Sequence, residues 1–209
     1  MSVEKSIIIF DTETSGLPIC CRYKEYPHPS NLKAYDPCRL VQLSYSIYTH
    51  RMTNLIIEKD AYIYPIGFEI SEESQKITGI SNEKIELEGK DLKIVLNEFI
   101  SDILNMKEVI LIGHNVLFDI NVIASELYRL GKTEESKWFH LLSTCCTMES
   151  TKNEIKIERQ LKSGKRVIKD PSLKEAYEFY SKGKSIENQH NSLYDVRNTA
   201  FVYKMFMQY

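Results

Sequence analysis

The pattern of hydrophobic and polar positions predicts strands at the start and in the middle of the chain. An apolar run at 7–10 ends before the turn residues Gly16 and Pro18, which is typical of a short strand buried on both faces. Residues 39–49 alternate between apolar and polar, as a half-exposed strand does, and 55–64 follow after a short connection as an antiparallel partner. A second apolar run at 109–112 predicts another buried strand.

Helical periodicity appears between and after these strands. Apolar residues recur at helical spacing over 91–104, and a stripe of Ile120, Ile123, Leu127 and Leu130 predicts a helix after 113. Ser71 is a suitable cap for a helix that Gly79 closes, and further helices are predicted at 172–180 and 192–207. The segment 138–147 is compatible with a last short strand. The succession of strand, polar turn and helix predicts an α/β fold: a mixed sheet of about five strands flanked by helices.

Length and composition favour one domain over residues 1–209. The chain has no run of eighteen apolar residues and no charged-then-apolar leader, so we expect neither a membrane span nor a secretory signal. Its five cysteines include two adjacent pairs without the spacing of a disulfide framework or a zinc site, which favours reduced thiols in a soluble intracellular protein. A net charge of −2 does not by itself indicate a nucleic-acid binder, although an acidic metal site would contribute negative charge.

Two irregular segments have their own composition. The stretch 18–38 carries four prolines and is predicted to be a long loop, whose Tyr23, Tyr26 and Tyr35 would either stack on bases or belong to an ordinary surface loop. Residues 155–169 are basic and predict a hairpin around Ser163 and Gly164. This hairpin is either a surface that contacts a nucleic-acid backbone or a solvated loop.

Two carboxylates stand where the first strand ends. Side chains two apart on an extended chain point to the same side, so Asp11 and Glu13 would lie together. Like charges at that separation repel unless a cation lies between them. The pair therefore indicates either a cation site or a solvated loop start, and the two interpretations are balanced for this pair alone.

Further candidates lie at the ends of other predicted elements. Asp119 falls in the first turn of its helix on the core-facing side, and Asp195 falls in the first turn of the last helix, shortly after His190. Each has a simpler explanation: Asn115 would cap the helix that bears Asp119, Asp195 would complete a capping box, and His190 would be a surface histidine. Taken together, four acids and a histidine at element ends that can converge favour one site.

Three stretches resemble the exonuclease motifs of the DEDDh superfamily of 3′–5′ exonucleases, which includes RNase T and the proofreading subunits of bacterial replicative DNA polymerases. They are FDTETSGL at 10–17, GHNVLFD at 113–119 and HNSLYDVRNT at 190–199. The motifs occur in order over nearly the whole chain. The resemblance implies an RNase H-like fold and removal of nucleotides from a 3′ end. The family commonly has Ala where Ser192 stands, and the 18–38 loop is longer than the family leads us to expect.

The resemblance also implies roles for these residues. Residues matching Asp11, Glu13 and Asp195 hold one Mg²⁺ or Mn²⁺ ion, and those matching Asp11 and Asp119 hold a second. Hard divalent cations prefer such oxygen ligands, and two of them can activate water near neutral pH. The residue matching His190 is the general base, a task suited to an imidazole pKa of about 6.5. The resemblance places a second set of residues against the terminal nucleotide: Thr12, Thr14, Leu17, His114, Asn115 and Phe118.

The sequence thus predicts a metal-dependent 3′–5′ exonuclease that releases nucleoside 5′-monophosphates from single-stranded ends. A role in DNA proofreading or excision is favoured over RNA 3′-end trimming, and a homodimer or a polymerase partner would be compatible with the family. The alternative of a different class is a pseudo-enzyme that binds nucleic acid or a polymerase without cutting. A nucleotide-binding α/β protein is not supported, since the chain has no glycine-rich phosphate-binding pattern.

Overall fold

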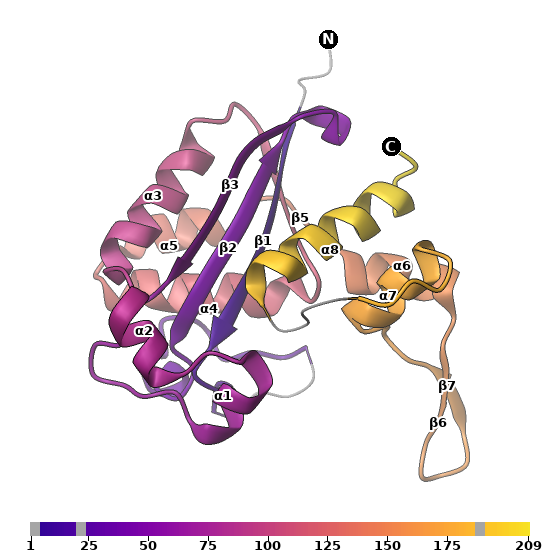
Figure 1. Ribbon diagram of the computed structural model, residues 1–209, viewed down its shortest axis with the longest axis horizontal. Helices are drawn as coiled ribbons and strands as arrows, with labels where there is room; N and C mark the ends of the chain where they lie inside the picture. Colours follow the sequence, from indigo (N-terminus) through magenta and orange to yellow (C-terminus); the bar gives the residue numbers. More distant parts are fainter. Residues whose placement is uncertain (1–4, 20–23, 187–190) are drawn as a thin grey trace.

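The computed structural model describes residues 5–19, 24–186 and 191–209. Five strands form one mixed sheet in the order β3-β2-β1-β4-β5 (Figure 1). Strands β1 (Ser6–Thr14), β2 (Leu40–Tyr48) and β3 (Leu55–Tyr62) are antiparallel neighbours, and β4 (Val109–Gly113) and β5 (Thr144–Cys146) run parallel to β1. The predicted mixed sheet of about five strands with flanking helices is therefore confirmed.

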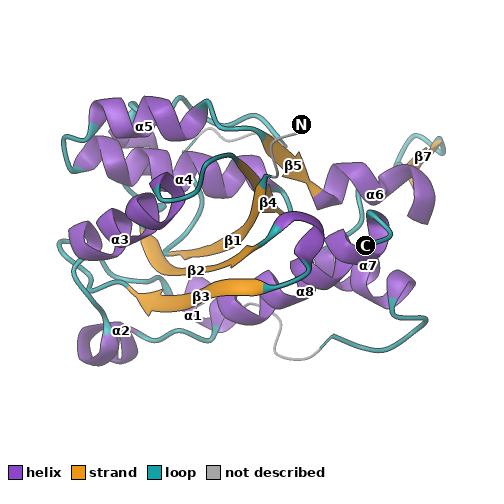
Figure 2. Ribbon diagram, turned by 90° about the horizontal axis from the view of Figure 1, so that it is seen from above, coloured by secondary structure: helices purple, strands orange, loops and turns teal. Residues whose placement is uncertain are grey.

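Helices cover both faces of this sheet. They are α1 (Glu72–Thr78), α2 (Asn82–Glu88), α3 (Leu92–Leu104), α4 (Val116–Arg129), α5 (Thr133–His140), α6 (Thr147–Ile155), α7 (Leu173–Tyr180) and α8 (Ser192–Phe206). Two short 3₁₀ helices lie at Leu32–Tyr35 and His50–Met52. Figure 2 shows α3, α4 and α5 on one side of the sheet and α8 on the other.

The central strand β1 is buried on both faces because its alternate side chains enter two cores. Ile8 and Phe10 belong to the larger core with α3, α4 and α5, where the Phe10 ring lies 5.9 Å from Phe99. Ile7 and Ile9 pack on the other face against α8. Each fully buried aliphatic or aromatic side chain stabilises the fold by about 1.5–3 kcal/mol. The apolar run at the start of the chain thus fixes β1 in the middle of the molecule.

The end of β1 extends past its parallel neighbour. The last residue of β1 that pairs with β4 is Ile9, opposite Ile112, so Asp11 and Glu13 lie beyond the point where β4 turns into α4. The pairing of β1 with β2 shifts register between Glu13 and Thr14. Such irregularities bend a strand and redirect its side chains. The carboxylates therefore stand at an edge that other elements can approach.

The expectation that 39–49 form a half-exposed strand is wrong. Every residue of β2 except Tyr48 is buried, including the polar residues Gln42, Ser44 and Ser46. The side chains of Gln42 and Ser44 both donate to Asp60 on β3 at 2.7 Å. Helix α8 packs over this face, so the polar side chains are satisfied by partners within the protein and not by water.

Most predicted helices are present, with small shifts at their ends. Ser71 caps α1, Gly79 ends it in the left-handed conformation, and Asp91 caps α3. The segment 138–147 contains the end of α5 and all of β5. The pattern did not predict α2, α5 and α6, which carry few apolar residues; α2 buries only Ile85 fully.

Two peripheral features complete the fold. Strands β6 (Glu158–Gln160) and β7 (Arg166–Ile168) form a two-stranded antiparallel hairpin that projects from the body of the molecule (Figure 1). In the loop between β1 and β2, Tyr35 is fully buried and its hydroxyl donates to the carbonyl of Pro27, so Tyr35 serves packing and not base stacking. Cys38, Cys145 and Cys146 carry free thiols. Within the described ranges, no helix is long and apolar enough to cross a membrane.

Candidate metal centre

Three carboxylates converge at the end of β1. Asp11 and Glu13 come from β1 and Asp195 from the first turn of α8, and one ligand oxygen of each lies within 4.8 Å of the others. Ser192 ties the two elements together, because its buried hydroxyl donates to the backbone carbonyl of Asp11 at 2.7 Å. The serine that departs from the family pattern thus contributes a contact between β1 and α8.

The cap of α8 is not the one that the capping box would require. Asn191 is the N-cap residue, and its side chain accepts a hydrogen bond from the backbone N–H of Tyr194. The Asp195 N–H donates to the carbonyl of Asn191 as in any helix, and Ser192 is already helical. The capping box expected as an alternative is therefore not formed with Ser192 as its cap. Asp195 instead presents its carboxylate to Asp11 and Glu13.

Asp119 joins this group from the opposite face of β1. Its side chain is 3% exposed, and one oxygen accepts from both the backbone N–H and the hydroxyl of Thr12, at 3.0 and 2.7 Å. Thr12 points away from Asp11 and Glu13 on the strand, so this contact fixes the start of α4 against β1. In this structure the Thr12 N–H is committed to Asp119 and not turned toward a substrate.

The carboxylates shift one another's pKa values upward. Burial, followed by the charges of Asp119, Glu13 and Asp195, raises the pKa of Asp11 well above its usual range. Burial and the charges of Asp195 and Asp119 raise the pKa of Glu13 to about 8. Burial raises the pKa of Asp119 to about 7, against the opposing effect of the Thr12 hydrogen bonds. Ionising this cluster near neutral pH therefore calls for a nearby positive charge.

The donor set fits a hard divalent cation. All the converging ligand atoms of Asp11, Glu13 and Asp195 are carboxylate oxygens, which suit Mg²⁺, Mn²⁺ or Ca²⁺ and not thiolate-seeking metals. Without a cation, the raised pKa values of Asp11 and Glu13 mean that these acids tend to retain their protons. A bound divalent ion would replace those protons. The acidic cluster is thus compatible with metal binding.

His114 lies in the turn between β4 and α4, but both of its ring nitrogens are already engaged. Nε2 lies 3.0 Å from the carbonyl of Pro171, and Nδ1 lies 2.9 Å from the hydroxyl of Thr147. A carbonyl only accepts, so Nε2 carries the proton and Nδ1 of the neutral ring is an acceptor; the Thr147 hydroxyl shares its hydrogen between Nδ1 and the carbonyl of Gly113, at 3.2 Å. Burial lowers the pKa of His114 to about 4, which keeps this neutral form at pH 7. His114 therefore joins β4, α6 and the segment before α7 and offers no ring nitrogen to a substrate.

Asn115 and Phe118 form a small polar and aromatic group with the 18–38 loop. Asn115 takes a left-handed conformation, with φ of 74°, and its amide donates to the hydroxyl of Tyr26 at 3.0 Å. It makes no side-chain cap to α4, which excludes the simple capping role. The Tyr26 ring lies 5.9 Å from that of Phe118. These contacts bring Tyr26 beside the turn that carries Asp119.

The remaining predicted residues are placed as follows. Thr14 is buried, and its hydroxyl donates to the carbonyl of Gly16, which closes the end of β1. Leu17 is 67% exposed, as are several other large apolar side chains of the protein, so its side chain is accessible to a ligand at the end of β1. His190 lies outside the described residues.

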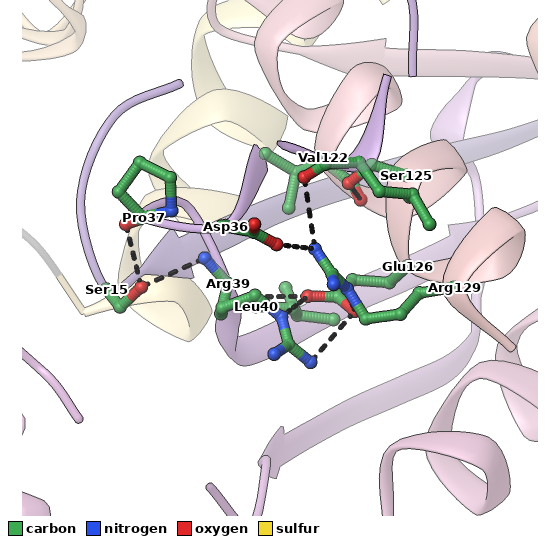
Figure 3. A network of polar contacts seen from close by, with 10 residues as sticks. Ser15, Asp36, Pro37, Arg39, Leu40, Val122, Ser125, Glu126 and Arg129 are labelled. Carbon is green, nitrogen blue, oxygen red and sulfur yellow. Dashed lines mark hydrogen bonds and ion pairs between the residues drawn. The ribbon is translucent and has the colours of Figure 1, made fainter. Parts of the chain in front are cut away.

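A second polar network, which the sequence did not suggest, fixes β1 and β2 to α4 (Figure 3). Arg39 and Glu126 form a buried ion pair at 2.7 Å, and the Leu40 N–H donates to the same carboxylate oxygen. The Ser15 hydroxyl accepts from the Arg39 N–H and donates to the carbonyl of Pro37. The partners are too far apart in sequence for a local motif to reveal them. This network holds the residues that follow Glu13 against the helix that bears Asp119.

Carboxylates that converge beside the buried Asp119 at one edge of an RNase H-like mixed sheet are the arrangement of a nuclease. The family model described as exonuclease matches residues 8–203, and the chain belongs to this exonuclease family, within the DEDD-type 3′–5′ exonuclease superfamily. The resemblance read from the three motifs is confirmed. A search among curated proteins finds no match.

Solved structures of E. coli exonuclease I share the fold. The chain is 18% identical to exonuclease I in complex with a dT13 oligonucleotide, with a TM-score of 0.69, over 96% of this chain and 40% of that one. It is also 18% identical to the zinc-bound form of the exonuclease I–single-stranded DNA complex, with a TM-score of 0.70, over 98% of this chain and 41% of the other. The chain thus spans about two fifths of these exonuclease I chains.

Proposed function

We propose that the chain is a metal-dependent exonuclease that removes nucleoside 5′-monophosphates from single-stranded 3′ ends. The observation that carries this proposal is the convergence of Asp11, Glu13 and Asp195, with ligand oxygens within 4.8 Å, beside the buried Asp119. Asp11, Glu13 and Asp195 would hold one cation, and Asp11 and Asp119 a second. Mg²⁺ or Mn²⁺ suits these oxygen ligands. When bound, such cations neutralise charge on the phosphate and lower the pKa of water.

The chain's own residues would divide the remaining tasks. His190, which shortly precedes Asp195 in the third motif, would accept the proton of the attacking water, a role that rests on the sequence motif alone. Thr12 holds Asp119 in place through two hydrogen bonds, and the network of Ser15, Arg39 and Glu126 holds the end of β1. Fixing acidic groups on a strand and two helices gives the precision that phosphoryl transfer needs.

Recognition of the terminal nucleotide would come from side chains around the cluster. The exposed Leu17 would pack against the terminal base, and Phe118 with Tyr26 would support the nucleotide from the 18–38 loop side. Backbone groups around Thr12 and Glu13, other than the Thr12 N–H that donates to Asp119, would meet the 3′-OH. His114 would act as a positioning residue, because both of its ring nitrogens are used inside the protein.

DNA is the favoured substrate, because exonuclease I structures of the same fold hold dT13 and dA16 oligonucleotides. Contacts to a 3′ end alone say little about a 2′-OH, so RNA 3′-end trimming is the competing outcome. Proofreading or excision would be the corresponding role in the cell. Association with a polymerase or with a second copy of the chain stays a prediction.

The test is a degradation assay on matched single-stranded DNA and RNA of the same sequence, labelled at the 5′ end. With Mg²⁺ or Mn²⁺, we expect a ladder that shortens from the 3′ end of DNA and the release of nucleoside 5′-monophosphates. The Asp11→Ala variant should bind the oligonucleotide without shortening it. Degradation of RNA alone would overturn the DNA preference, and equal activity of Asp11→Ala would overturn the mechanism.

A further inference from the structure

The projecting hairpin formed by residues 156–169 concentrates positive charge in a chain whose net charge is −2. It is the segment drawn in orange that leaves the body of the molecule beyond α6 (Figure 1). Its only acidic residue is Glu158. Its basic residues are Lys156, Arg159, Lys162, Lys165, Arg166 and Lys169.

Most of these cations are not neutralised by the protein. Arg166 pairs with Glu158 at 3.3 Å, and Lys169 pairs with Glu175. The other four side chains are exposed and make no ion pair within the described part of the chain: Lys156, Arg159, Lys162 and Lys165. A solvated hairpin would tolerate one such charge easily, but several like charges on one short hairpin repel each other and lower its stability. An anionic partner would relieve that repulsion.

The register of the hairpin sorts its side chains onto two faces. Arg159 lies opposite Val167, and backbone hydrogen bonds continue the ladder from Lys169 to Ile157 and from Leu161 to Lys165. Because alternate residues share a face, one face carries a mixture of cations and half-buried aliphatic side chains. This face consists of Ile157, Arg159, Leu161, Lys165, Val167 and Lys169. Cations beside aliphatic groups suit the phosphates and sugars of a nucleic-acid strand.

The root of the hairpin is fixed close to the acidic cluster. Lys152 on α6 and Lys24 from the 18–38 loop both form ion pairs with Asp170, at 3.0 and 2.9 Å, and that side chain is 5% exposed. The next residue, Pro171, accepts the hydrogen bond from His114 in the turn that leads into α4. The same helix α4 carries Asp119 in its first turn. The hairpin is therefore attached to the framework of the site, while its three-residue strands, about 10 Å long, extend away from it.

We propose that this hairpin is a nucleic-acid-binding arm that holds the phosphates of the strand upstream of the terminal nucleotide. The inference rests on the proposed exonuclease function and adds how the substrate is held. Four carboxylates at the cutting site repel a polyanion, so a separate cationic segment supplies the attraction. Phosphates are common to DNA and RNA, so the arm binds either strand, and the identity of the sugar is read elsewhere.

The test compares two triple variants that remove the same charge. The arm variant combines Arg159→Ser, Lys162→Ser and Lys165→Ser, and the control combines Lys5→Ser, Lys107→Ser and Lys204→Ser. The control residues are exposed and lie before β1, before β4 and near the end of α8. Both sets are made in the Asp11→Asn background, so the strand stays intact. Fluorescence anisotropy of a labelled single-stranded oligonucleotide of about twenty nucleotides then gives the dissociation constant at several salt concentrations.

The arm variant is expected to bind about tenfold or more weakly at 0.1 M salt. The slope of log affinity against log salt should fall by about 2, because each lost phosphate contact on a single strand removes about 0.7. The control should keep the slope and affinity of its parent, and an arm variant with Arg159→Lys, Lys162→Arg and Lys165→Arg should keep both as well. Unchanged affinity and slope in the serine arm variant would overturn the proposal. An arm that binds a protein partner and not nucleic acid would give this result.

Failure of the arm and failure of the enzyme give different results. If the wild-type protein degrades no nucleic acid but the arm variant binds the oligonucleotide more weakly and with a smaller salt dependence, the proposed function is wrong and the nucleic-acid-binding role of the arm is supported. If the wild-type protein degrades the strand and the arm variant matches the control, the arm is wrong and the proposed function stands. Thermal unfolding of both triple variants checks that each remains folded.

Discussion

Two groups of buried or partly buried carboxylates in this protein have opposite electrostatic surroundings. Glu126 is 1% exposed, and the chain supplies two counterions, Arg39 at 2.7 Å and Arg129 at 3.5 Å, together with the Leu40 N–H. Asp11 and Glu13 are partly buried, and the charges that act on them most strongly are those of other carboxylates. A buried acid with a fixed counterion serves the fold, whereas acids gathered against each other require a cation from solution.

The largest effect we expect concerns activity. Glu13→Gln should lower the rate of nucleotide release about a thousandfold or more, because bound cations stabilise the transition state by several kcal/mol and each 1.4 kcal/mol is a factor of ten. Initial rates on a labelled oligonucleotide measure this. The matched control is Glu72→Gln, whose side chain is 92% exposed. A loss of similar size in both variants would show that the cluster has no special role.

The counterion of Glu126 gives the next largest effect, on stability. Arg39→Met should lower the free energy of unfolding by about 2–3 kcal/mol, since the buried carboxylate of Glu126 then keeps only Arg129, at 3.5 Å, as a counterion. Urea denaturation measures this change. The double variant Arg39→Met/Glu126→Met should recover most of the loss, because the buried carboxylate is gone and Arg129 keeps its ion pair with Asp36 at 3.1 Å. A single variant within 1 kcal/mol of the wild-type protein would contradict the structural role of this pair.

Neutralising an acid of the cluster should have the opposite sign in the metal-free protein. Glu13→Gln removes a carboxylate whose pKa is raised to about 8, so at pH 8 with a chelator the variant should be more stable than the wild-type protein. Taking only one pKa unit as a lower bound, the gain is about 1 kcal/mol. Denaturation at pH 8 and at pH 4 separates this cause from altered packing, because the gain should vanish at pH 4. If Glu13→Gln were less stable than the wild-type protein at both pH values, its effect would have the same sign as that of Arg39→Met, and the proposed difference between the two groups of carboxylates would be wrong.

A further predicted effect on stability is a metal-dependent shift in melting temperature. The pKa values of Glu13 and Asp119 are raised to about 8 and 7, so the stability that their protonated forms give the metal-free protein is present at low pH and is lost as pH rises through these values. Mg²⁺ at ten times its dissociation constant should add about 1.4 kcal/mol, or about 4 °C, at pH 8. At pH 5.5 the shift should be clearly smaller, as scanning calorimetry can show. Equal shifts at both pH values would argue against binding at the cluster.

The sequence predicts the parts of this architecture that local pattern controls. The apolar run before Asp11, the helical stripe of α4 and the cap Ser71 are encoded within one or two turns of the residues concerned. The burial of Ser44 and Ser46 is not, because it depends on α8, more than a hundred residues later. An alternating strand looks half-exposed until the element that covers its polar face is known.

The same distinction holds for the site. Spacing alone places Asp11 and Glu13 on one side of a strand, and the three motifs bring in Asp119 and Asp195. The partners of His114 could not be predicted, because Thr147 and Pro171 come from different elements and no motif links them to it. The motif therefore predicts a substrate contact for His114, whereas the structure uses both of its ring nitrogens to connect the turn after β4 to α6 and to the segment before α7.

The most direct test of the central claim is a Mn²⁺ titration of the purified protein at pH 8, with free Mn²⁺ followed by electron paramagnetic resonance. If the cluster is a cation site, the wild-type protein should bind Mn²⁺ saturably, and Asp11→Asn should weaken binding about tenfold or more, with Glu72→Gln unchanged. Identical titration curves for the wild-type protein and Asp11→Asn, or no saturable binding at all, would contradict the account.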